Sequence, residues 1–435
     1  MTEQRVAAPA ETSTDPFARH HRWNALAFAI DMGLFMVGMN FINATVVLPS
    51  FVTALGGNEL AVGLANGLAS GGWLLPQLVI AGVVARMPRK KPIIVSGAWI
   101  SRPLMLVLAL IIWLLGESLP RVTMIVTMAT VFIFFVFDAV VSVPWFDLVA
   151  RALPARRRGR ILGTAQVLGG IGGIGAGVFV RYILGDASPL RFPNNYAILY
   201  VIAALFFTGS TIALMMIREP EPQAVDDSVP RLGAVLMSLP RILMQDRPFL
   251  RLVIVRVLGG FVTIASAFYV LHATQHVGLS YEATGFFVSA QVAGSLFSGL
   301  LMGMVQDRWG PRTHIRTILI ISGLPAVIAL GINVMAGTLG QAALYPYLLL
   351  YFFLGINMSS IGWPFFNWVL EYAPEAQRPL YIGMINTLAA LTMLAPTLGG
   401  WIIRVASYPA VFATALGFAA VALLLSLTLP STRNS

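Results

Sequence analysis

The sequence predicts an all-α membrane protein with twelve transmembrane helices, arranged as two six-helix bundles related by a pseudo-twofold axis. Of its 435 residues, 57% are hydrophobic and only 11% are charged, and the mean hydropathy is +0.81. Soluble domains carry about 25% charged residues. A bilayer-spanning helix needs roughly 20 mainly apolar residues, and the chain has twelve such runs. The alternating segments of about ten residues that build membrane β-barrels are missing from the sequence.

The apolar runs fall six on each side of a polar stretch. They lie at 23–48, 60–85, 93–115, 121–144, 160–184 and 194–217, and then at 249–275, 283–305, 315–336, 342–366, 380–404 and 409–429. Six of them contain a proline that should kink the helix, namely Pro76, Pro103, Pro144, Pro325, Pro364 and Pro396. The expected organisation is a disordered cytoplasmic N-terminus (1–18), an N-terminal bundle (19–217), a cytoplasmic linker (218–248), a C-terminal bundle (249–430) and a cytoplasmic tail (431–435).

The net charge of +10 is unevenly placed along the chain. With the N-terminus inside, most basic residues fall in the loops of the inner side, and only Arg121, Arg181, Arg191 and Arg404 fall outside. This positive-inside bias predicts a multi-pass protein of the cytoplasmic membrane with both termini in the cytoplasm. No basic stripe interleaved with aromatic residues remains for nucleic acid. The absence of Cys excludes disulfides and thiolate chemistry.

The two halves repeat each other in sequence. Four residues of 146–163 recur 220 positions later, as the pairs Phe146 and Phe366, Pro154 and Pro374, Arg158 and Arg378, and Gly163 and Gly383. The segments that begin at Gly82 and Gly303 form a second pair, with an offset of 221. Transporters built from parallel repeats have their working site where the repeats meet.

These features resemble the major facilitator superfamily over nearly the whole chain after residue 20. The segment from Gly303 to Arg312 is similar to the family's loop motif G-x-x-x-D-R-x-G-R-[KR], and it supplies Asp307, Arg308, Gly310 and Arg312. The resemblance implies that Asp307 is a gate residue that caps a facing helix N-terminus, where a carboxylate is favoured. The first-half copy has no Asp, since Arg86 aligns with either Asp307 or Arg308.

Further gate residues follow from the same resemblance. Asp147 and Arg158 match the family's pattern after the fourth helix, and Glu371 and Arg378 match its twin after the tenth. The repeat register places Arg151 opposite Glu371. We expect this pair to bridge the two halves when the inner side closes. The alternative is that both are solvated loop charges, whose pairing contributes only about 0–1 kcal/mol.

Three ionisable residues lie inside the predicted spans, where such groups face a cavity or a partner. Asp31 lies in the first span, Asp138 in the fourth and Arg256 in the seventh, and Arg102 is a weaker fourth case. One interpretation makes either carboxylate a proton or cation site with Arg256 as counter-charge, because a carboxylate in a low-dielectric medium can exchange a proton near neutral pH. The other is a static ion pair, or snorkelling towards the interface.

Polar amides and one aromatic residue complete the predicted substrate or proton site. They are Asn40, Asn43, Gln166, Gln291, Asn357, Asn386 and Trp363. Buried amides also join membrane helices, at about 0.6–2 kcal/mol each. Trp363 could wall an organic ligand or belong to an interfacial belt.

The expected function is transport of a small organic solute by alternating access, facilitated or proton-coupled, by a monomer without cofactors. His272 and His276 have a spacing that could bind zinc, but no third ligand is evident, so no metal site is expected. None of the five His lies in mid-membrane beside a matched acid, so the chain is not expected to be an enzyme. The alternative is a receptor or assembly factor on the same fold, because fold does not fix function.

Overall fold

The computed structural model describes residues 20–220, 240–374 and 377–432, and within these ranges every regular element is a helix. The predicted disordered N-terminus (1–18) lies outside the described residues, as do most of the predicted linker and the last three residues of the tail.

The first half contains nine helices among its described residues. They are α1 (His21–Phe41), α2 (Val47–Ala54), α3 (Glu59–Leu74), α4 (Gln77–Ala85), α5 (Lys91–Ser101), α6 (Leu104–Leu115), α7 (Pro120–Ala152), α8 (Ala155–Leu184) and α9 (Asn194–Met216). Pro76 separates α3 from α4 and Pro103 separates α5 from α6, because proline lacks the backbone donor that would continue the helix. Pro144, in contrast, lies inside the continuous helix α7.

The second half is more irregular. Its main helices are α11 (Arg247–Phe261), α12 (Tyr269–Leu271), α13 (Ala283–Leu339), α14 (Leu344–Ser360), α15 (Trp363–Tyr372), α16 (Arg378–Ala389), α17 (Ala395–Val405) and α18 (Tyr408–Ser426). Short segments join some of them, namely η1 (Val262–Ala265), η2 (His272–His276), η3 (Gly340–Ala343) and η5 (Ala390–Leu394). Helix α13 breaks at Gly310, whose φ of 77° lies in the left-handed region that favours glycine.

Ten stretches of the described residues are long and apolar enough to cross a membrane. One of them, Ala283–Tyr372, has 90 residues and contains the break at Gly310. At 1.5 Å per residue a helix of that length would measure about 135 Å, several times the roughly 30 Å of a bilayer's hydrocarbon core. This stretch therefore crosses more than once.

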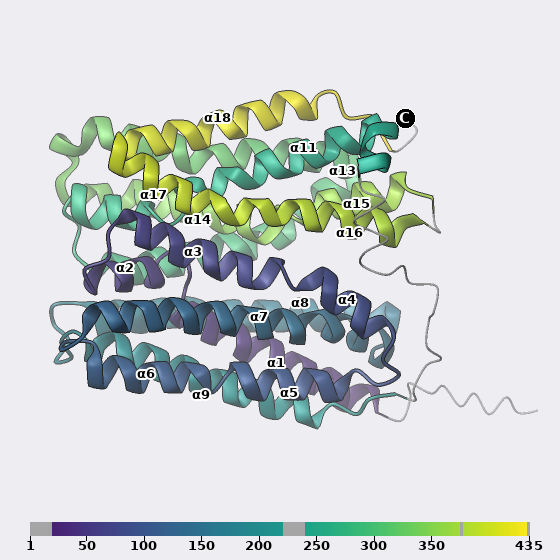
Figure 1. The fold of residues 1–435 in the computed structure, drawn as a ribbon, viewed down its shortest axis with the longest axis horizontal. Coiled ribbons are helices and arrows are strands. Elements are labelled where there is room, and N and C mark those ends of the chain that lie inside the picture. Colours follow the sequence, from purple (N-terminus) through teal and green to yellow (C-terminus); the bar gives the residue numbers. More distant parts are fainter. Residues whose placement is uncertain (1–19, 221–239, 375–376, 433–435) are drawn as a thin grey trace, which may run out of the picture.

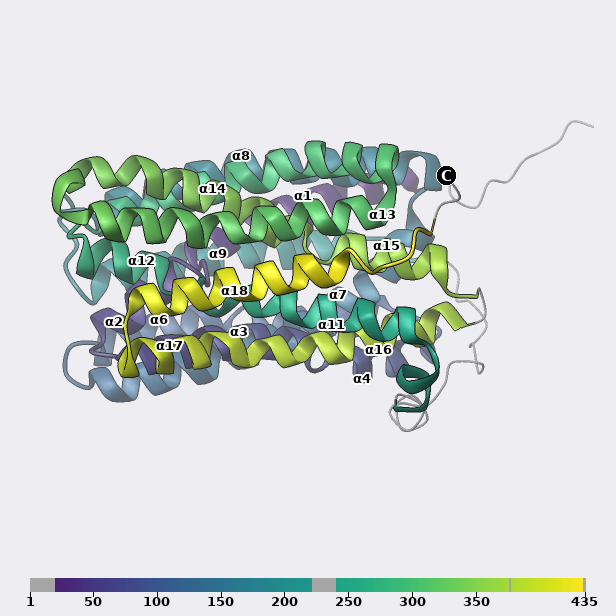
Figure 2. The same ribbon diagram turned by 90° about the horizontal axis from the view of Figure 1, so that it is seen from above.

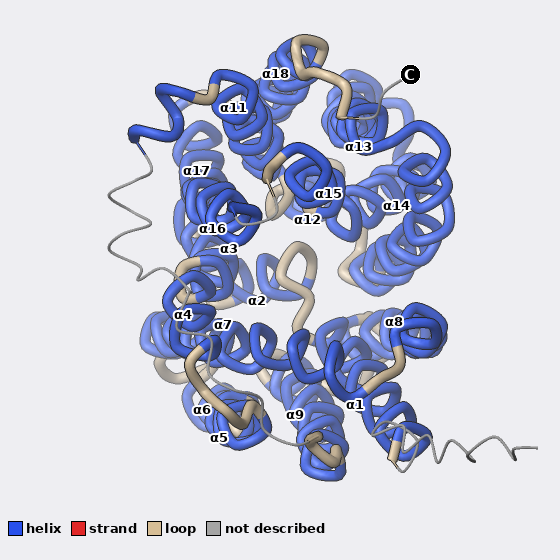
Figure 3. The backbone as a smooth tube through the Cα atoms, turned by 90° about the vertical axis from the view of Figure 1, so that its right-hand side faces the viewer, coloured by secondary structure: helices blue, strands red, loops and turns tan. Residues whose placement is uncertain are grey.

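The helices of the two halves lie on opposite sides of the molecule, with α1–α9 on one side and α11–α18 on the other (Figures 1 and 3). The long helices run parallel to the longest axis (Figures 1 and 2). We call the end where α15 meets α16 and the C-terminus lies the basic end, since it carries the basic loops. The opposite end is where α17 meets α18.

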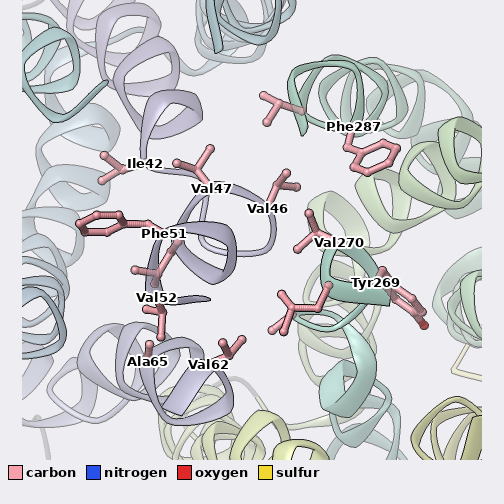
Figure 4. Packing of buried hydrophobic residues seen from close by; sticks show 14 of the residues in the cluster. Ile42, Val46, Val47, Phe51, Val52, Val62, Ala65, Tyr269, Val270 and Phe287 are labelled. Carbon is pink, nitrogen blue, oxygen red and sulfur yellow. The ribbon is translucent and has the colours of Figure 1, made fainter. Parts of the chain in front are cut away.

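The apolar core shows where the two halves adhere. The largest buried cluster joins both halves, and includes Val47 and Val62 from the first with Val270 and Phe287 from the second (Figure 4). Each of the other four buried clusters contains residues of one half only. Helix α2, which carries Val47, lies at the opposite end (Figures 1 and 2). Apolar contact between the halves is therefore concentrated away from the basic end.

Glycines allow the halves to approach backbone to backbone. A Cβ placed on Gly63 of α3 would lie 2.2 Å from the carbonyl oxygen of Pro396, and one on Gly285 of α13 would lie 2.3 Å from that of Gly177 in α8. Small residues serve this purpose in membrane proteins, where close packing replaces the hydrophobic effect between helices. Helix pairs α3–α17 and α8–α13 thus form two tight seams between the halves.

Candidate functional site

A cavity of about 240 Å³ lies between α3 of the first half and the helices of the second. Its polar lining includes seven side chains of the described residues, those of Ser70, Arg256, Thr263, Ser266, Ser322, Asn357 and Thr392. Trp73 and Tyr269 add aromatic surface. Two residues predicted for the substrate site, Arg256 and Asn357, are thereby brought together although they are distant in the sequence.

Among the described residues that line the cavity, Arg256 alone is charged. Its guanidinium carbon lies 5.4 Å from the ring centroid of Phe365, within the range of a cation–π contact. None of the ion pairs found among the described residues includes Arg256. The side chain is thus a half-buried cation without a counter-charge in the described part of the chain.

Asn357 also faces the cavity with an unused side chain. It is 7% exposed, and its amide makes no hydrogen bond to the described residues. The cavity hydroxyls differ, because Thr263 Oγ1 donates to the carbonyl of Gly260 at 2.8 Å and Ser266 Oγ donates to that of Thr263 at 2.8 Å. Ser322 and Thr392 also donate to helix carbonyls. The lining side chains that make no hydrogen bond to the described residues are therefore Arg256 and Asn357, together with Ser70, Trp73 and Tyr269.

Asp31 belongs to a separate polar cluster inside the first half. Its Oδ2 accepts a hydrogen bond from Trp145 Nε1 at 2.8 Å, and its Oδ1 accepts one from Ser210 Oγ. Arg102 places a terminal nitrogen 3.7 Å from Oδ1, and both charged side chains are almost fully buried. The prediction that Arg256 is the counter-charge of Asp31 is therefore wrong, since Arg102 has that role.

Asp138 lies on α7 next to this cluster. It is half-buried, makes no hydrogen bond or ion pair with the described residues, and interacts electrostatically with Arg102 and Asp31. The one cation near Asp138 is already paired with Asp31, and both oxygens of Asp31 accept hydrogen bonds. Asp138 therefore suits proton exchange better than Asp31 does.

The other predicted amides have varied surroundings, and none lines the cavity. Gln291 joins the halves, because its Oε1 accepts from Asn43 Nδ2 at 3.1 Å. Asn40 donates to the carbonyl of Met36 at 2.8 Å. Gln166 is half-buried and Asn386 is exposed. Trp363, 58% exposed, also lies outside the cavity lining, with its ring edge-on to Phe366.

Arg151 is at the centre of a charged cluster at the basic end. Its Nε lies 3.2 Å from Asp147 Oδ2, and a terminal nitrogen lies 3.2 Å from Glu219 Oε1. Glu219 also accepts from the backbone N–H groups of Lys90 and Lys91 at the start of α5, where a carboxylate is favoured. Burial lowers the pKa of the Lys90 amine. Arg151 therefore pairs within its own half in this structure, and the predicted partner Glu371 instead accepts from Thr432 at 2.5 Å.

Glu219 was not among the predicted site residues. The sequence signal that could have found it is its place immediately after the sixth span, in the inner region that carries the basic loops.

Arg158 and Arg378 perform equivalent tasks in the two repeats. Arg158 donates to the carbonyl of Leu153 at 3.3 Å, just after the end of α7. Arg378 donates to the carbonyl of Ala373 at 3.2 Å, just after the end of α15. Both cap a helix C-terminus, where cations and spare donors are favoured. The repeated motif thus has a structural role that the gate interpretation overlooked.

The loop motif around Gly310 lies at the junction of the two parts of α13. Asp307 and Arg308 are exposed, and the guanidinium of Arg308 lies 5.2 Å from the ring of Trp309. Arg312 donates to the carbonyl of Leu427 at 3.2 Å, near the end of α18.

The histidine residues do not form a metal site in the described part of the chain. His272 Nδ1 is 2.5 Å from the hydroxyl of Tyr347, and its ring stacks on His276 with centroids 4.9 Å apart. His314 links two segments of the second half, with Nε2 at 2.8 Å from Ser360 Oγ.

Comparison with known proteins identifies the family. A model described as Major Facilitator Superfamily matches residues 30–393 and 257–435. The multidrug resistance protein MdtG of Enterobacter lignolyticus (strain SCF1) is 25% identical over 177 residues, which cover 41% of this chain and 41% of that protein. The match thus spans less than half the length of this relative.

Solved structures share the fold over most of the chain. The D-xylose-proton symporter is 16% identical with a TM-score of 0.68, covering 94% of this chain and 98% of that one. A bacterial homologue of the iron transporter ferroportin is 12% identical in its inward-facing state, with a TM-score of 0.67, covering 93% and 98%. Its outward-facing state, at the same identity and coverage, gives a TM-score of 0.62.

Proposed function

This chain belongs to the major facilitator superfamily, and we propose that it moves a small organic solute across the cytoplasmic membrane by alternating access. Its ten candidate spans include the 90-residue stretch that crosses more than once. Division of that stretch at Gly310 and again between Leu339 and Leu344 gives twelve crossings, six in each half. The equivalent caps made by Arg158 and Arg378 support a pseudo-twofold relation between the halves.

One observation carries the proposal. The apolar cluster that joins the halves lies away from the basic end, while the clusters nearer that end are each confined to one half. Two halves that adhere at one end, with a polar cavity between them, are the arrangement that rocking about a central site requires.

The basic end faces the cytoplasm in this proposal, by the positive-inside rule. Both termini are then cytoplasmic, and the protein acts as a monomer. A reporter that is active only in the cytoplasm, fused after Ser435, tests the orientation.

Asp138 is the proposed proton site. The buried pair of Asp31 and Arg102 fixes the electrostatic field around it, and Asp138 has no hydrogen-bond partner of its own among the described residues. A change in solvent access between states would then change its proton affinity. On this proposal, solute uptake depends on the pH gradient.

Arg151 and Glu371 remain the proposed gate between the halves. In the present structure Arg151 pairs with Asp147 and Glu219. Closure of the basic end would bring Glu371 within reach, so that Arg151 exchanges partners. Charge reversal at both sites should then restore transport that is lost in either single reversal, and a lack of rescue contradicts the pairing.

Transport itself is tested by screening and then by flux. Purified protein is unfolded thermally with a library of metabolites, because a ligand at about 100 times its dissociation constant stabilises the folded state by about 2.7 kcal/mol. Each hit is then measured for uptake into proteoliposomes. Saturable flux supports the proposal. A solute that binds but does not cross favours the receptor alternative.

A further inference from the structure

We propose that the transported solute carries a carboxylate, which binds Arg256 with Asn357 as a second donor. This inference rests on the proposed function, since it names the chemical class of the solute at the same central cavity. It is carried by an imbalance of charge and of hydrogen-bond donors in the lining of that cavity.

The imbalance of charge is specific to Arg256. Arg256 lies nine residues, or about 14 Å, into the 30-residue candidate span Arg247–His276, which is about a third of the way along it. Ionisable residues at such depth pair with another group or face a water-filled cavity. Arg256 faces the cavity, and no acidic residue is among the residues that line it.

A comparison within the chain shows how a structural arginine differs. Arg102, also inside the membrane, is 3% exposed and has Asp31 as its counter-charge, with Thr211 Oγ1 as a hydrogen-bond acceptor at 3.1 Å. Its charge and donors are used by the protein. Arg256 has no such counter-charge or acceptor among the described residues. Its guanidinium instead lies over the ring of Phe365 and lines the cavity.

The free donors favour an acceptor-only ligand. The hydroxyl hydrogens of Thr263 and Ser266 are used by helix carbonyls, so these groups offer no additional donor in their present orientation. Arg256 and Asn357 present N–H groups to the same space, and Ser70, Trp73 and Tyr269 add lining donors that make no hydrogen bond to the described residues. Arg256 is the charged one among these donors. A carboxylate accepts two parallel N–H bonds from a guanidinium, which gives both strength and orientation.

The size of the cavity and its single charge narrow the chemical class of the solute. Its volume of about 240 Å³ lies below the range of roughly 300–1,000 Å³ that is common for ligand pockets, so the solute is small. One cation balances one negative charge, which favours a monocarboxylate over a phosphate dianion. Trp73 of α3 and Tyr269 provide aromatic surface for the rest of the molecule. Because Trp73 belongs to the first half, a bound solute would touch both halves.

The test measures the thermal shift of the full chain in detergent with a broad panel of small metabolite monocarboxylates and the neutral amide of each acid. Chloride and inorganic phosphate are included. We expect at least one acid to stabilise the protein while its amide does not. In Arg256→Gln its apparent Kd should rise by tenfold or more, and Arg256→Lys should retain part of the affinity.

Arg251→Gln is the matched control, because Arg251 lies on the same helix but is exposed and donates to the carbonyl of Thr428. It should bind the acid as the wild type does. The melting temperature of each variant without ligand shows whether it is folded.

The inference is overturned if no acid of the panel binds, if an acid binds Arg256→Gln as tightly as the wild type, or if the solute proves neutral or cationic. Phosphate or chloride binding in place of every acid would also reject the carboxylate. Saturable flux of a neutral solute would leave the proposed function standing, whereas binding without flux of an acid would reject the proposed function and not the site.

Discussion

Replacement of Gly285 by alanine should prevent the halves from closing at the opposite end. A Cβ at Gly285 would lie 2.3 Å from the backbone nitrogen of Arg181 and 2.3 Å from the carbonyl oxygen of Gly177. Both neighbours are backbone atoms of α8, so they cannot move aside without moving the helix. The added methyl group therefore acts against the seam between α8 and α13, which holds the opposite end closed in this structure.

The magnitude follows from the cost of overpacking. Insertion of an extra carbon into a packed interface costs about 1–3 kcal/mol. If the seam opens in the other state, the whole cost falls on the closed state. A difference of 1–3 kcal/mol changes an equilibrium by about 5–150-fold. The population should shift by that factor towards the state that is open at the opposite end.

The chain contains no cysteine, which makes the assay direct. Thr263→Cys introduces a single thiol into the cavity lining, and a membrane-impermeant maleimide is applied from either side of oriented vesicles. In Gly285→Ala, labelling from the side of the opposite end should become faster relative to labelling from the basic end. Gly299→Ala is the control, because it lies on the same helix and its Cβ would meet no atom within 4 Å. Equal labelling ratios in the two folded variants would refute the reasoning.

The remaining predictions concern the charged groups of the first half and the helix caps. Asp31→Asn or Arg102→Met should each lower the free energy of unfolding by about 3–5 kcal/mol, because each leaves an uncompensated buried charge, and the double variant should recover much of it, as measured by thermal unfolding. Asp138→Asn should abolish uptake driven by a pH gradient but leave the melting temperature and solute binding unchanged; gradient-driven uptake at the wild-type rate would remove Asp138 from coupling. Arg378→Gln should cost about 0.3–1 kcal/mol of stability through loss of the helix cap, with solute affinity intact in the same binding assay.

Most of the fold could be predicted from the sequence because its signals are local. The apolar runs, the prolines that separate α3 from α4 and α5 from α6, and the loop motif at Gly310 each depend on a few neighbouring residues. The repeat register also identified Arg158 and Arg378 as equivalent residues of the two repeats, but it could not reveal the acceptors of their hydrogen bonds. Those are backbone carbonyls, which have no signature in the sequence.

The partners of the buried charges could not be predicted in the same way. One interpretation of the sequence made Arg256 the counter-charge of Asp31 or Asp138, yet Asp31 pairs with Arg102, 71 residues further along the chain. Which cation pairs with Asp31 depends on which faces of α1, α5 and α9 meet. The hydrogen bond from Ser210 of α9 holds the Asp31 carboxylate beside Arg102. Sequence spacing identifies the face of one helix but not the face of its neighbour.

The corrected pairing has a consequence for coupling. With Asp31 neutralised by Arg102, the acid left for proton exchange is Asp138 in the first half, and the cation left for the solute is Arg256 in the second. Protonation and solute binding then use different halves, and none of the ion pairs among the described residues joins Asp138 to Arg256. If both proposals hold, the coupling must pass through the relative position of the halves, since only one state exposes each group to a given side. A variant that favours one state, such as Gly285→Ala, should therefore change the apparent affinities for proton and solute together, while Asp138→Asn should remove the dependence of the solute affinity on pH.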